Sequence, residues 1–252
     1  MMAKKGGDKR LKRMKAPAFW PIPRKRDLWV AKPAPGPHRS GHSLPLLVVV
    51  RDILGLARTY KEAKIILAEQ KVKVDGKPRT DLKFPIGIMD VIEIPEAGRC
   101  YRVLPSSEVL SLHPVSAEEA GFKLCRIEGK KSLKGGLFQL NLHDGRVLIV
   151  GEESGERSYP ASGLKTFDVL KMALPEQQVL GYFSFNLGSY AIVVGGKNIG
   201  RHGKMVELGQ EQGLQQKIVT IQDAEGNRFQ TVLEYVFLLG EQERSISLPE
   251  VS

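Results

Sequence analysis

The chain has 252 residues, 42% of them hydrophobic, which is enough to form a core divided among about two or three small domains. No run of about 18 apolar residues occurs, so the sequence excludes a membrane-spanning helix, and no apolar run is long enough for a signal-peptide core. Cys100 and Cys125 stand apart, without the spacing of a zinc site or a disulfide framework, so we expect reduced thiols and a cytosolic protein.

The formal net charge of +10 is confined to the first 43 residues, which we call the arm. The arm holds two acidic residues, Asp8 and Asp27, while the rest of the chain holds 26 basic and 26 acidic residues and is neutral. A neutral body with a cationic arm predicts a polyanionic partner, most commonly RNA or DNA. The basic residues of the arm are Lys4, Lys5, Lys9, Arg10, Lys12, Arg13, Lys15, Arg24, Lys25, Arg26, Lys32 and Arg39.

The arm is too poor in apolar residues to offset its ordering entropy, so we expect it to be extended or disordered until it binds. It nevertheless holds both tryptophans, Trp20 and Trp29, and Phe19. Aromatic rings among cations suit RNA, because the cations neutralise phosphate while the rings stack on unpaired bases. Two alternatives stay open: Phe19 and Trp20 dock on the body as a clip, and the charges of 4–15 form a solvated run or a localisation patch. Prolines in and just after the arm argue against an amphipathic membrane helix.

Residues 44–105 are expected to form a compact α/β module. A first helix is indicated by apolar residues at the spacing of one helix face, although the valine run 48–50 favours a strand; they are Leu46, Val49, Val50 and Ile53. The capping box Thr59 to Glu62 begins a second helix, with Lys61, Lys64 and Lys71 expected on its outer face.

A hairpin follows the second helix. The alternating residues 71–74 run into Asp75-Gly76, a strong turn signal, and a strand is expected at about 88–94. Basic residues Lys73, Lys77 and Arg79 belong to this hairpin, so the helix and the hairpin are predicted to converge with their cations on one side.

Residues 106–178 are predicted to form a small antiparallel β domain. A capped helical turn at 116–120 precedes strands at 122–127, 137–142 and 147–150, with a turn at Asp144-Gly145. The stretch 129–132 superficially suggests a phosphate loop, but Leu124 stands where such a loop requires glycine. Its lysines, Lys130, Lys131 and Lys134, are instead a candidate RNA-contacting loop.

Residues 179–252 are predicted to form strands at 190–194, 217–221 and 228–233 around a loop rich in glycine and basic residues, 195–204. The glycines permit turns and close approach of a polyanion to the backbone, while Lys197, Arg201 and Lys204 supply charge. The pattern resembles the KOW motif of translation proteins built on an SH3-like barrel. A loop that serves barrel geometry alone remains the alternative.

Three motifs of the module resemble the small RNA-binding fold named after bacterial ribosomal protein four: Thr59-x-x-Glu62-Ala63, Val72-x-Val74-Asp75-Gly76-Lys77-Pro78-Arg79 and Met89-Asp90-Val91-Ile92. In the arm, Ala16-Pro17-x-x-Trp20 and Pro35-Gly36-Pro37-His38 resemble the S4e family, the small-subunit ribosomal protein four of archaea and eukaryotes. Parts of 116–125 and of the C-terminal region resemble the same family, so the resemblance covers almost the whole chain.

The resemblance implies an α+β multidomain protein: a basic arm (1–43), a ribosomal protein four-like RNA-binding module (44–105), a central antiparallel β domain (106–178) and a C-terminal SH3-like barrel with a KOW motif (179–252). It implies a structural constituent of the small ribosomal subunit in the cytoplasm, with rRNA and neighbouring ribosomal proteins as partners, and without membrane, small-molecule substrate, cofactor or homo-oligomer. Its compact length looks archaeal. Beyond the arm cations, the rRNA-binding residues expected are Trp20, His38, Arg58, Lys61, Lys64, Lys71, Lys73, Lys77, Arg79, Lys197, Arg201 and Lys204.

An RNA-modifying enzyme and a free translation factor are the alternatives. A pseudouridine synthase would need a catalytic aspartate in an Arg-Leu-Asp context, which is missing, and Asp144 is explained by its turn. The five histidines are scattered without metal-ligand spacing, so we expect no catalytic residue and no metal site. A translation factor would share the barrel motif but not the arm.

Overall fold

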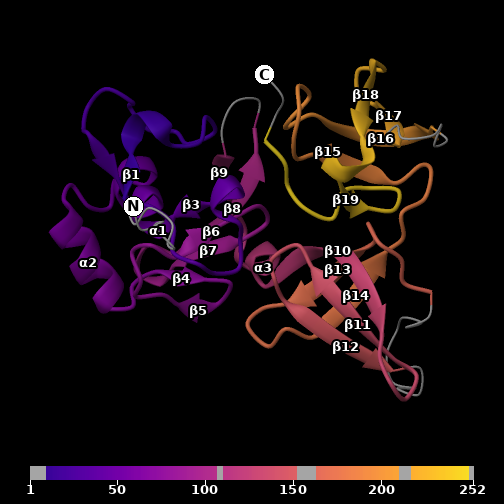
Figure 1. Ribbon diagram of the computed structural model, residues 1–252, viewed down its shortest axis with the longest axis horizontal. Helices are drawn as coiled ribbons and strands as arrows, with labels where there is room; N and C mark the ends of the chain where they lie inside the picture. The colour runs from indigo at the N-terminus through magenta and orange to yellow at the C-terminus, as the bar shows by residue number, and fades with distance from the viewer. Residues whose placement is uncertain (1–9, 107–109, 152–162, 210–216, 250–252) are drawn as a thin grey trace, which may run out of the picture.

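The computed structural model describes residues 10–106, 110–151, 163–209 and 217–249. The fold is mostly β, with few helices, and its elements gather into an N-terminal, a central and a C-terminal lobe (Figure 1). Three five-stranded antiparallel sheets form the lobes, and two strand pairs accompany the first of them. No helix of the described residues is long and apolar enough to cross a membrane.

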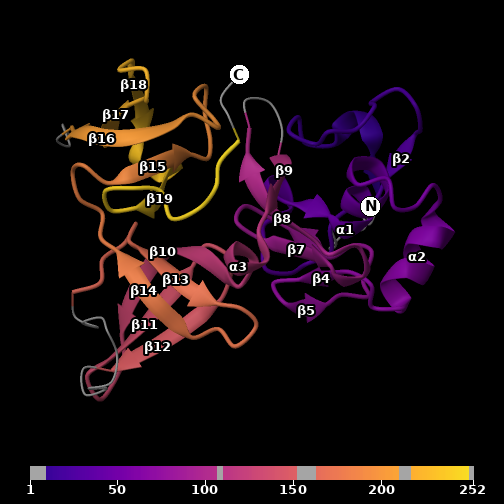
Figure 2. The ribbon, with the colours of Figure 1, turned by 180° about the vertical axis from the view of Figure 1, so that it is seen from behind.

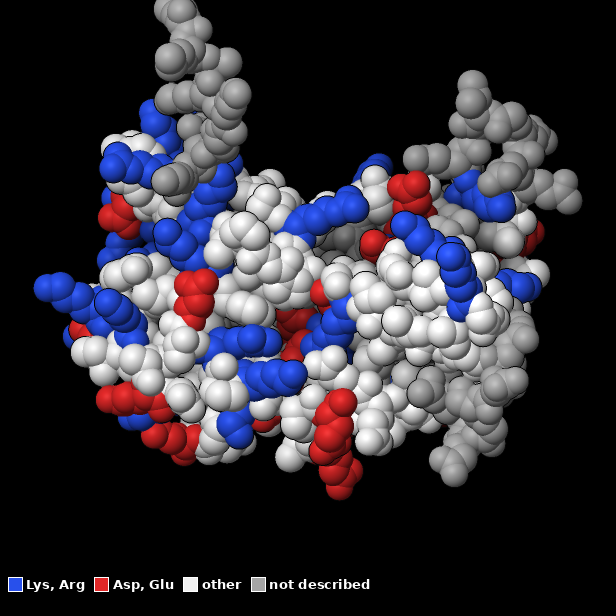
Figure 3. All heavy atoms as spheres, turned by 60° about the horizontal axis from the view of Figure 1, so that its bottom comes forward, with Lys and Arg blue, Asp and Glu red and all other residues white. Residues whose placement is uncertain are grey.

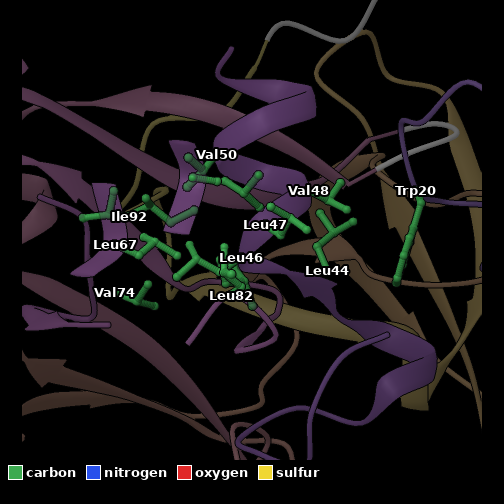
Figure 4. Packing of buried hydrophobic residues seen from close by; sticks show 14 of the residues in the cluster. Trp20, Leu44, Leu46, Leu47, Val48, Val50, Leu67, Val74, Leu82 and Ile92 are labelled. Atoms are coloured by element: carbon green, nitrogen blue, oxygen red, sulfur yellow. The ribbon is translucent and has the colours of Figure 1, made fainter. Parts of the chain in front are cut away.

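From residue 10 on, the arm folds onto the N-terminal lobe, which corrects for these residues the expectation of an extended or disordered segment. Strand β1 (Leu11–Lys12) pairs with β2 (Trp29–Val30), and Trp20, Ile22 and Val30 are buried in the core of the lobe. Trp20 lies beside Leu44 and Val48 (Figure 4). Its ring is 2% exposed and its Nε1–H donates to the carbonyl of Ser43 at 3.0 Å. Trp20 therefore docks on the body as a clip, which was one of the two alternatives for the arm. Burial of its ring offsets the entropy lost when the arm becomes ordered.

Both predicted helices of the module are present. Helix α1 (Leu46–Val48) continues as the π-helical segment η3 (Val49–Ile53), so apolar contact prevails over the strand propensity of the valine run. Helix α2 (Tyr60–Ala68) begins at Thr59, whose Oγ1 accepts from the Glu62 N–H at 3.3 Å. The Glu62 carboxylate reaches back and accepts from the N–H of Arg58, one residue before the cap, so it closes the start of the helix much as a capping box does.

The module sheet has the strand order β5-β4-β7-β8-β9, and the short pair β3 (Leu44–Pro45) and β6 (Pro85–Ile86) flanks it. The predicted hairpin turn holds Asp75 and Gly76 at φ values of 52° and 71°, the left-handed conformation that a two-residue turn requires. The strands are β4 (Lys73–Val74), β5 (Lys77–Pro78), β7 (Val91–Ile94), β8 (Arg99–Pro105) and β9 (Leu110–Val115).

The central sheet has the order β12-β11-β10-β13-β14. The predicted helical turn is α3 (Ala117–Ala120), capped by Ser116, whose Oγ accepts from the Glu119 N–H. The strands are β10 (Phe122–Ser132), β11 (Leu137–Leu142), β12 (Val147–Gly151), β13 (Val169–Ala173) and β14 (Val179–Phe183). Strands β9 and β14 extend the first two sheets beyond the expected boundaries at 105 and 178.

The C-terminal sheet has the order β18-β17-β16-β15-β19. Its strands are β15 (Tyr190–Val193), β16 (His202–Leu208), β17 (Ile218–Gln222), β18 (Arg228–Val232) and β19 (Val236–Gly240), with the 3-10 turn η5 (Leu233–Tyr235) before the last. The glycine-basic stretch ends earlier than expected, because His202 to Lys204 already belong to β16.

The three lobes share core residues. Met89 and Leu104 of the module and Leu124 and Val169 of the central sheet lie in one buried cluster with the C-terminal strands. After β19 the chain returns along the boundary between the C-terminal and N-terminal lobes, as both ribbon views show (Figures 1 and 2). There Ser247 Oγ donates to the Glu119 carboxylate at 2.7 Å, so the terminal segment is tied to helix α3.

Candidate nucleic-acid interface

A buried ionic cluster fixes how the lobes are placed relative to one another. Lys123, on β10, directs its ammonium at three carboxylates: Asp75 at 2.9 Å, Asp144 at 3.2 Å, and Asp90 in close contact. Asp75 and Asp90 belong to the module, and Asp144 to the turn after β11. Arg146 adds a second cation, 2.6 Å from Asp75 and 3.1 Å from Asp144. A buried charge is tolerated only when it is paired, and here every carboxylate faces a cation.

The charges of this cluster reinforce one another. Burial alone would raise the pKa of Asp90, but His38 and Lys123 outweigh it and hold that pKa far below its ordinary value. Burial also opposes the charge of Lys123, yet the carboxylates of Asp90, Asp75 and Asp144 raise the pKa of its ammonium well above the ordinary value. Asp90 and Lys123 are therefore charged at neutral pH.

His143 is the neutral member of the cluster. Burial, together with the nearby Lys123 ammonium, lowers the pKa of His143 to about 3. Its Nδ1 accepts from the Arg126 N–H at 3.2 Å and its Nε2 lies 3.3 Å from the Ile88 carbonyl. The ring also meets Phe237 of β19 edge-on, with 5.3 Å between centroids, so His143 joins all three lobes.

Cys125, His143 and Asp144 place three possible metal-ligand atoms within 4.8 Å of one another. The Asp144 carboxylate in this group is already matched by Lys123 and Arg146, whose charges oppose a bound cation. Burial also raises the pKa of the Cys125 thiol, which keeps it protonated and a poor ligand. The arrangement is suited to holding lobes together and not to binding a metal.

The arm presents most of its described cations to solvent. Arg24 is half-buried, and its guanidinium donates to the carbonyls of Ala16 and Pro17 at 2.6 and 2.5 Å, which shapes the surrounding loop. Lys32 is also half-buried, whereas Lys4, Lys5 and Lys9 lie outside the described residues. Basic side chains make up much of the surface at the left of Figure 3, the side of the arm and module in Figure 1. The exposed arm cations are Arg10, Lys12, Lys15, Lys25, Arg26 and Arg39.

Three side chains of the arm that were expected to contact rRNA are instead buried against other parts of the protein. Trp20 has no free face for a base. Arg13 is 2% exposed, donates to the Pro23 carbonyl at 2.9 Å and pairs with Asp27 at 3.2 Å. His38 is buried against Asp90, with 3.0 Å between Nε2 and each carboxylate oxygen.

The basic residues of the module that were predicted to bind rRNA fall into an exposed group and a half-buried group. Arg58, Lys61 and Lys64 are exposed on and just before α2, and Lys77 is exposed on β5. Lys71 does not share the α2 face, because the helix ends at Ala68 and Gln70 adopts a φ of 58°. It pairs instead with Glu69 and Glu96, at 2.9 and 3.4 Å. Lys73 and Arg79 are half-buried, and the Arg79 guanidinium lies over the Phe84 ring at 4.5 Å.

The loop between β15 and β16 exposes Lys197, and Lys204 is exposed on β16. Arg201 is half-buried, 4.1 Å above the Phe229 ring and 3.5 Å from Asp223. Gly203 serves packing, since a Cβ there would lie 2.0 Å from the Gln222 carbonyl oxygen. This stretch therefore does both things: Gly203 is required for close packing, and Lys197 and Lys204 present positive charge to solvent.

Two residues have roles that the sequence does not predict. Lys123 falls within a predicted strand, yet it is the central cation of the buried cluster. Trp29 is not among the predicted rRNA-binding residues, yet it is 46% exposed whereas Trp20 is buried. Lys12 and Trp29 share one face because β1 pairs with β2 in this register, and the sequence carries no signal for that pairing.

Three family descriptions match the chain in sequence: the RS4NT domain over residues 5–40, the S4 domain over 44–92 and the ribosomal family S4e over 97–179. The small ribosomal subunit protein eS4 of Desulfurococcus amylolyticus is 48% identical over 250 residues, which are 99% of each chain. The eS4 protein of Methanocaldococcus jannaschii is 42% identical over 98% of this chain and 100% of its own. The crystal structure of the 30S ribosomal protein S4e from Thermoplasma acidophilum matches with a TM-score of 0.65 and 32% identity, covering 79% of this chain and 96% of that one.

Proposed function

The chain belongs to the ribosomal S4e family, and we propose from this membership that it binds and anchors rRNA in the small ribosomal subunit. It is a structural constituent of that subunit and not an enzyme. The similarity to eS4 proteins extends over almost the full length of the chain. An RNA-modifying enzyme or a free translation factor would share single regions of the chain and not the arm, the module and the later lobes in this order, so both alternatives are disfavoured.

One observation carries the proposed mechanism: the surplus of positive charge lies in the arm, and most of the described arm cations are exposed on a folded lobe. Six of them face solvent, Arg10, Lys12, Lys15, Lys25, Arg26 and Arg39. Since arm and module share one core, these cations are held in place before binding and little ordering entropy is lost when RNA binds. Arg58, Lys61, Lys64 and Lys77 extend the basic surface over the module.

A groove of about 850 Å³ lies between the arm and the central lobe and offers a second contact region. Lys32, Arg39 and Lys83 contribute cations to its lining, and Glu128 an acid. Its floor includes His38 and His143, which belong to the ionic cluster. We assign this groove to a phosphate backbone because its cations outnumber its carboxylates and the buried cluster keeps it open.

We further assign a KOW motif to 195–204 and an SH3-like barrel to the C-terminal lobe. The support is a five-stranded antiparallel sheet with a glycine-basic loop between β15 and β16. We divide the chain at residues 43, 105 and 178, with β9 and β14 counted with the sheets they join. Its partners are then rRNA through the arm, the module and this loop, and ribosomal neighbours elsewhere; it works as one copy per subunit, in the cytoplasm.

Several modest contacts on one rigid chain act at high effective concentration once the first is formed, so together they bind far more tightly than any one of them. Ribosome fractionation of a tagged chain at moderate salt tests the proposal. Comigration with the small subunit supports it. A tagged chain that stays in the soluble fraction at every growth stage contradicts it.

A further inference from the structure

We propose that Trp29 is a stacking platform for an unpaired RNA base, with Arg10 and Lys12 contacting the phosphates beside that base. The inference rests on the proposed function, because it takes RNA as the ligand. It adds a specific site: a single flat side chain on the β1–β2 ribbon that gains affinity through stacking and not through charge.

The strand pairing directs Trp29 outward. Lys12 lies opposite Trp29 and Leu11 opposite Val30, so each of these pairs shares one face of the ribbon. Val30 is buried in the core and Leu11 packs against it, which fixes the inner face. Lys12 and Trp29 must therefore occupy the outer face, and both are exposed.

A cation already lies over the Trp29 ring. The Arg10 guanidinium lies 5.8 Å from the ring centroid, at the distance of a cation–π contact. A base that stacked on the open part of the ring would bring its phosphate within reach of Arg10 and Lys12. Two other exposed cations of the arm, Lys25 and Arg26, lie four and three residues before Trp29 in the sequence.

The surroundings favour RNA over a neighbouring protein. Met14 and Leu28, 68% and 63% exposed, give the ribbon an apolar character that would suit an apolar protein groove. The charge decides between the two: Asp27 is the only acidic residue of the arm that the structure describes, and Arg13 already pairs with it. An aromatic ring among cations, with few acidic residues nearby, is typical of sites that bind single-stranded RNA.

The ribbon is also accessible. Figure 1 shows β1, and Figure 2 shows β2, on the side of the N-terminal lobe that is away from the C-terminal lobe. The other tryptophan, Trp20, is enclosed by the core, so the two rings of this chain form a natural pair of target and internal control.

Fluorescence of the full chain, titrated with a small-subunit rRNA transcript, tests the stacking directly. The Trp20→Phe variant leaves Trp29 as the single tryptophan, and the Trp29→Phe variant leaves Trp20, so excitation selective for tryptophan reports each ring by itself; thermal melting confirms that each variant is folded. We expect bound RNA to quench the emission of Trp29 and to leave that of Trp20 unchanged. Binding without quenching of Trp29 would overturn the proposal.

The affinity of Trp29 variants for the same transcript distinguishes stacking from simple apolar contact, and this measurement does not depend on tryptophan emission. Trp29→Phe is expected to bind the transcript nearly as the parent does, while Trp29→Leu and Trp29→Ala bind about ten- to a hundredfold more weakly. The dependence on salt stays the same in all three, because stacking releases no counterions.

The remaining outcomes are distinguishable. If Trp29→Leu binds like the parent and only Trp29→Ala is weak, position 29 needs apolar volume and not an aromatic face, and the stacking proposal is wrong. Equal affinity of all variants for the transcript also overturns the proposal: Trp29 then does not touch RNA, as the apolar protein alternative requires, while the arm remains an anchor. A parent chain that does not bind the transcript contradicts the proposed function itself.

Discussion

The imidazole Nε2 of His38 lies 3.0 Å from both carboxylate oxygens of Asp90, which joins the arm to the module. The same carboxylate accepts from the Gly87 N–H at 2.9 Å and contacts the ammonium of Lys123 in the central lobe. One side chain thus ties arm, module and central lobe together. The contact also requires glycine at position 87, where a Cβ would lie 2.3 Å from His38 Nδ1.

Replacing the central cation of this cluster is expected to be strongly destabilising. Lys123→Met keeps most of the side-chain volume but leaves the carboxylates of Asp75, Asp90 and Asp144 without their shared ammonium. Breaking a buried pair in this way costs about 3–5 kcal/mol, which should lower the denaturant midpoint markedly. Lys131→Met is the matched control, because Lys131 is exposed on the same strand. Equal midpoints for the two variants would show that the cluster contributes little.

His143 gives the fold a dependence on pH. Its pKa of about 3 in the folded protein lies below the ordinary value of about 6.5, so the unfolded chain binds the extra proton first. The contribution of neutral His143 is fully present above about pH 6.5 and is lost as the pH falls toward 3, by at most about 1.4 kcal/mol per pH unit.

The lowered pKa of Asp90 also makes the folded protein less stable in acid, but at lower pH than His143 does. Its contribution is present above the unfolded value of about 3.9 and is lost only in stronger acid. We therefore expect His143→Gln to flatten the decline in unfolding free energy between about pH 6 and 4.5, measured against the parent at each pH. A decline as steep in the variant as in the parent would assign the acid sensitivity to another group.

The two tryptophans should differ in their effect on stability. Trp20→Ala removes a buried ring and the Nε1–H contact to Ser43, so we expect a loss of about 3–5 kcal/mol and faster proteolysis within the arm. Trp29→Ala removes an exposed ring and is expected to change stability by about 0.5 kcal/mol or less. Thermal melting and limited proteolysis compare the two directly. If Trp20→Ala melts like Trp29→Ala, the arm is not held by its core contact.

Local signals in the sequence predicted local structure well. Thr59 with Glu62, Ser116 with Glu119, and Asp75-Gly76 each form the cap or turn expected, because the side chains that make these contacts are within three residues of one another. The family motifs depend on the same short patterns, which is why the S4e resemblance was visible in the sequence alone.

Contacts across long sequence separations were not visible. His38 meets Asp90 across 52 positions and Lys123 meets Asp75 across 48, and no periodicity marks such partners. The first part of β10 is covered on both faces, since the consecutive residues Lys123, Leu124 and Cys125 are all buried, so the alternation that normally distinguishes inner from outer residues fails for Lys123. Charge counting likewise treated every cation of the arm alike, although Arg13 is buried and Arg26 is exposed.

The salt dependence of rRNA binding should report which exposed cations contact phosphate. Deleting the arm is an unsuitable test, because Trp20, Ile22 and Val30 belong to the core and the truncated protein would lose stability along with charge. The double variant Lys25→Ala/Arg26→Ala removes two exposed charges instead. Each phosphate contact contributes about 0.7 to 0.9 to the slope of log affinity against log salt, so the slope should become shallower by about 1.4 to 1.8.

A matched pair of exposed cations far from the arm, changed as Arg228→Ala/Arg244→Ala, has the same effect on net charge. We expect it to leave the slope unchanged, because counterions are released only where phosphates are contacted. Filter binding of the small-subunit transcript over a range of salt concentrations measures both slopes. If both pairs change the slope equally, net charge governs binding and the arm is not a specific anchor; if neither does, Lys25 and Arg26 are solvated in the complex.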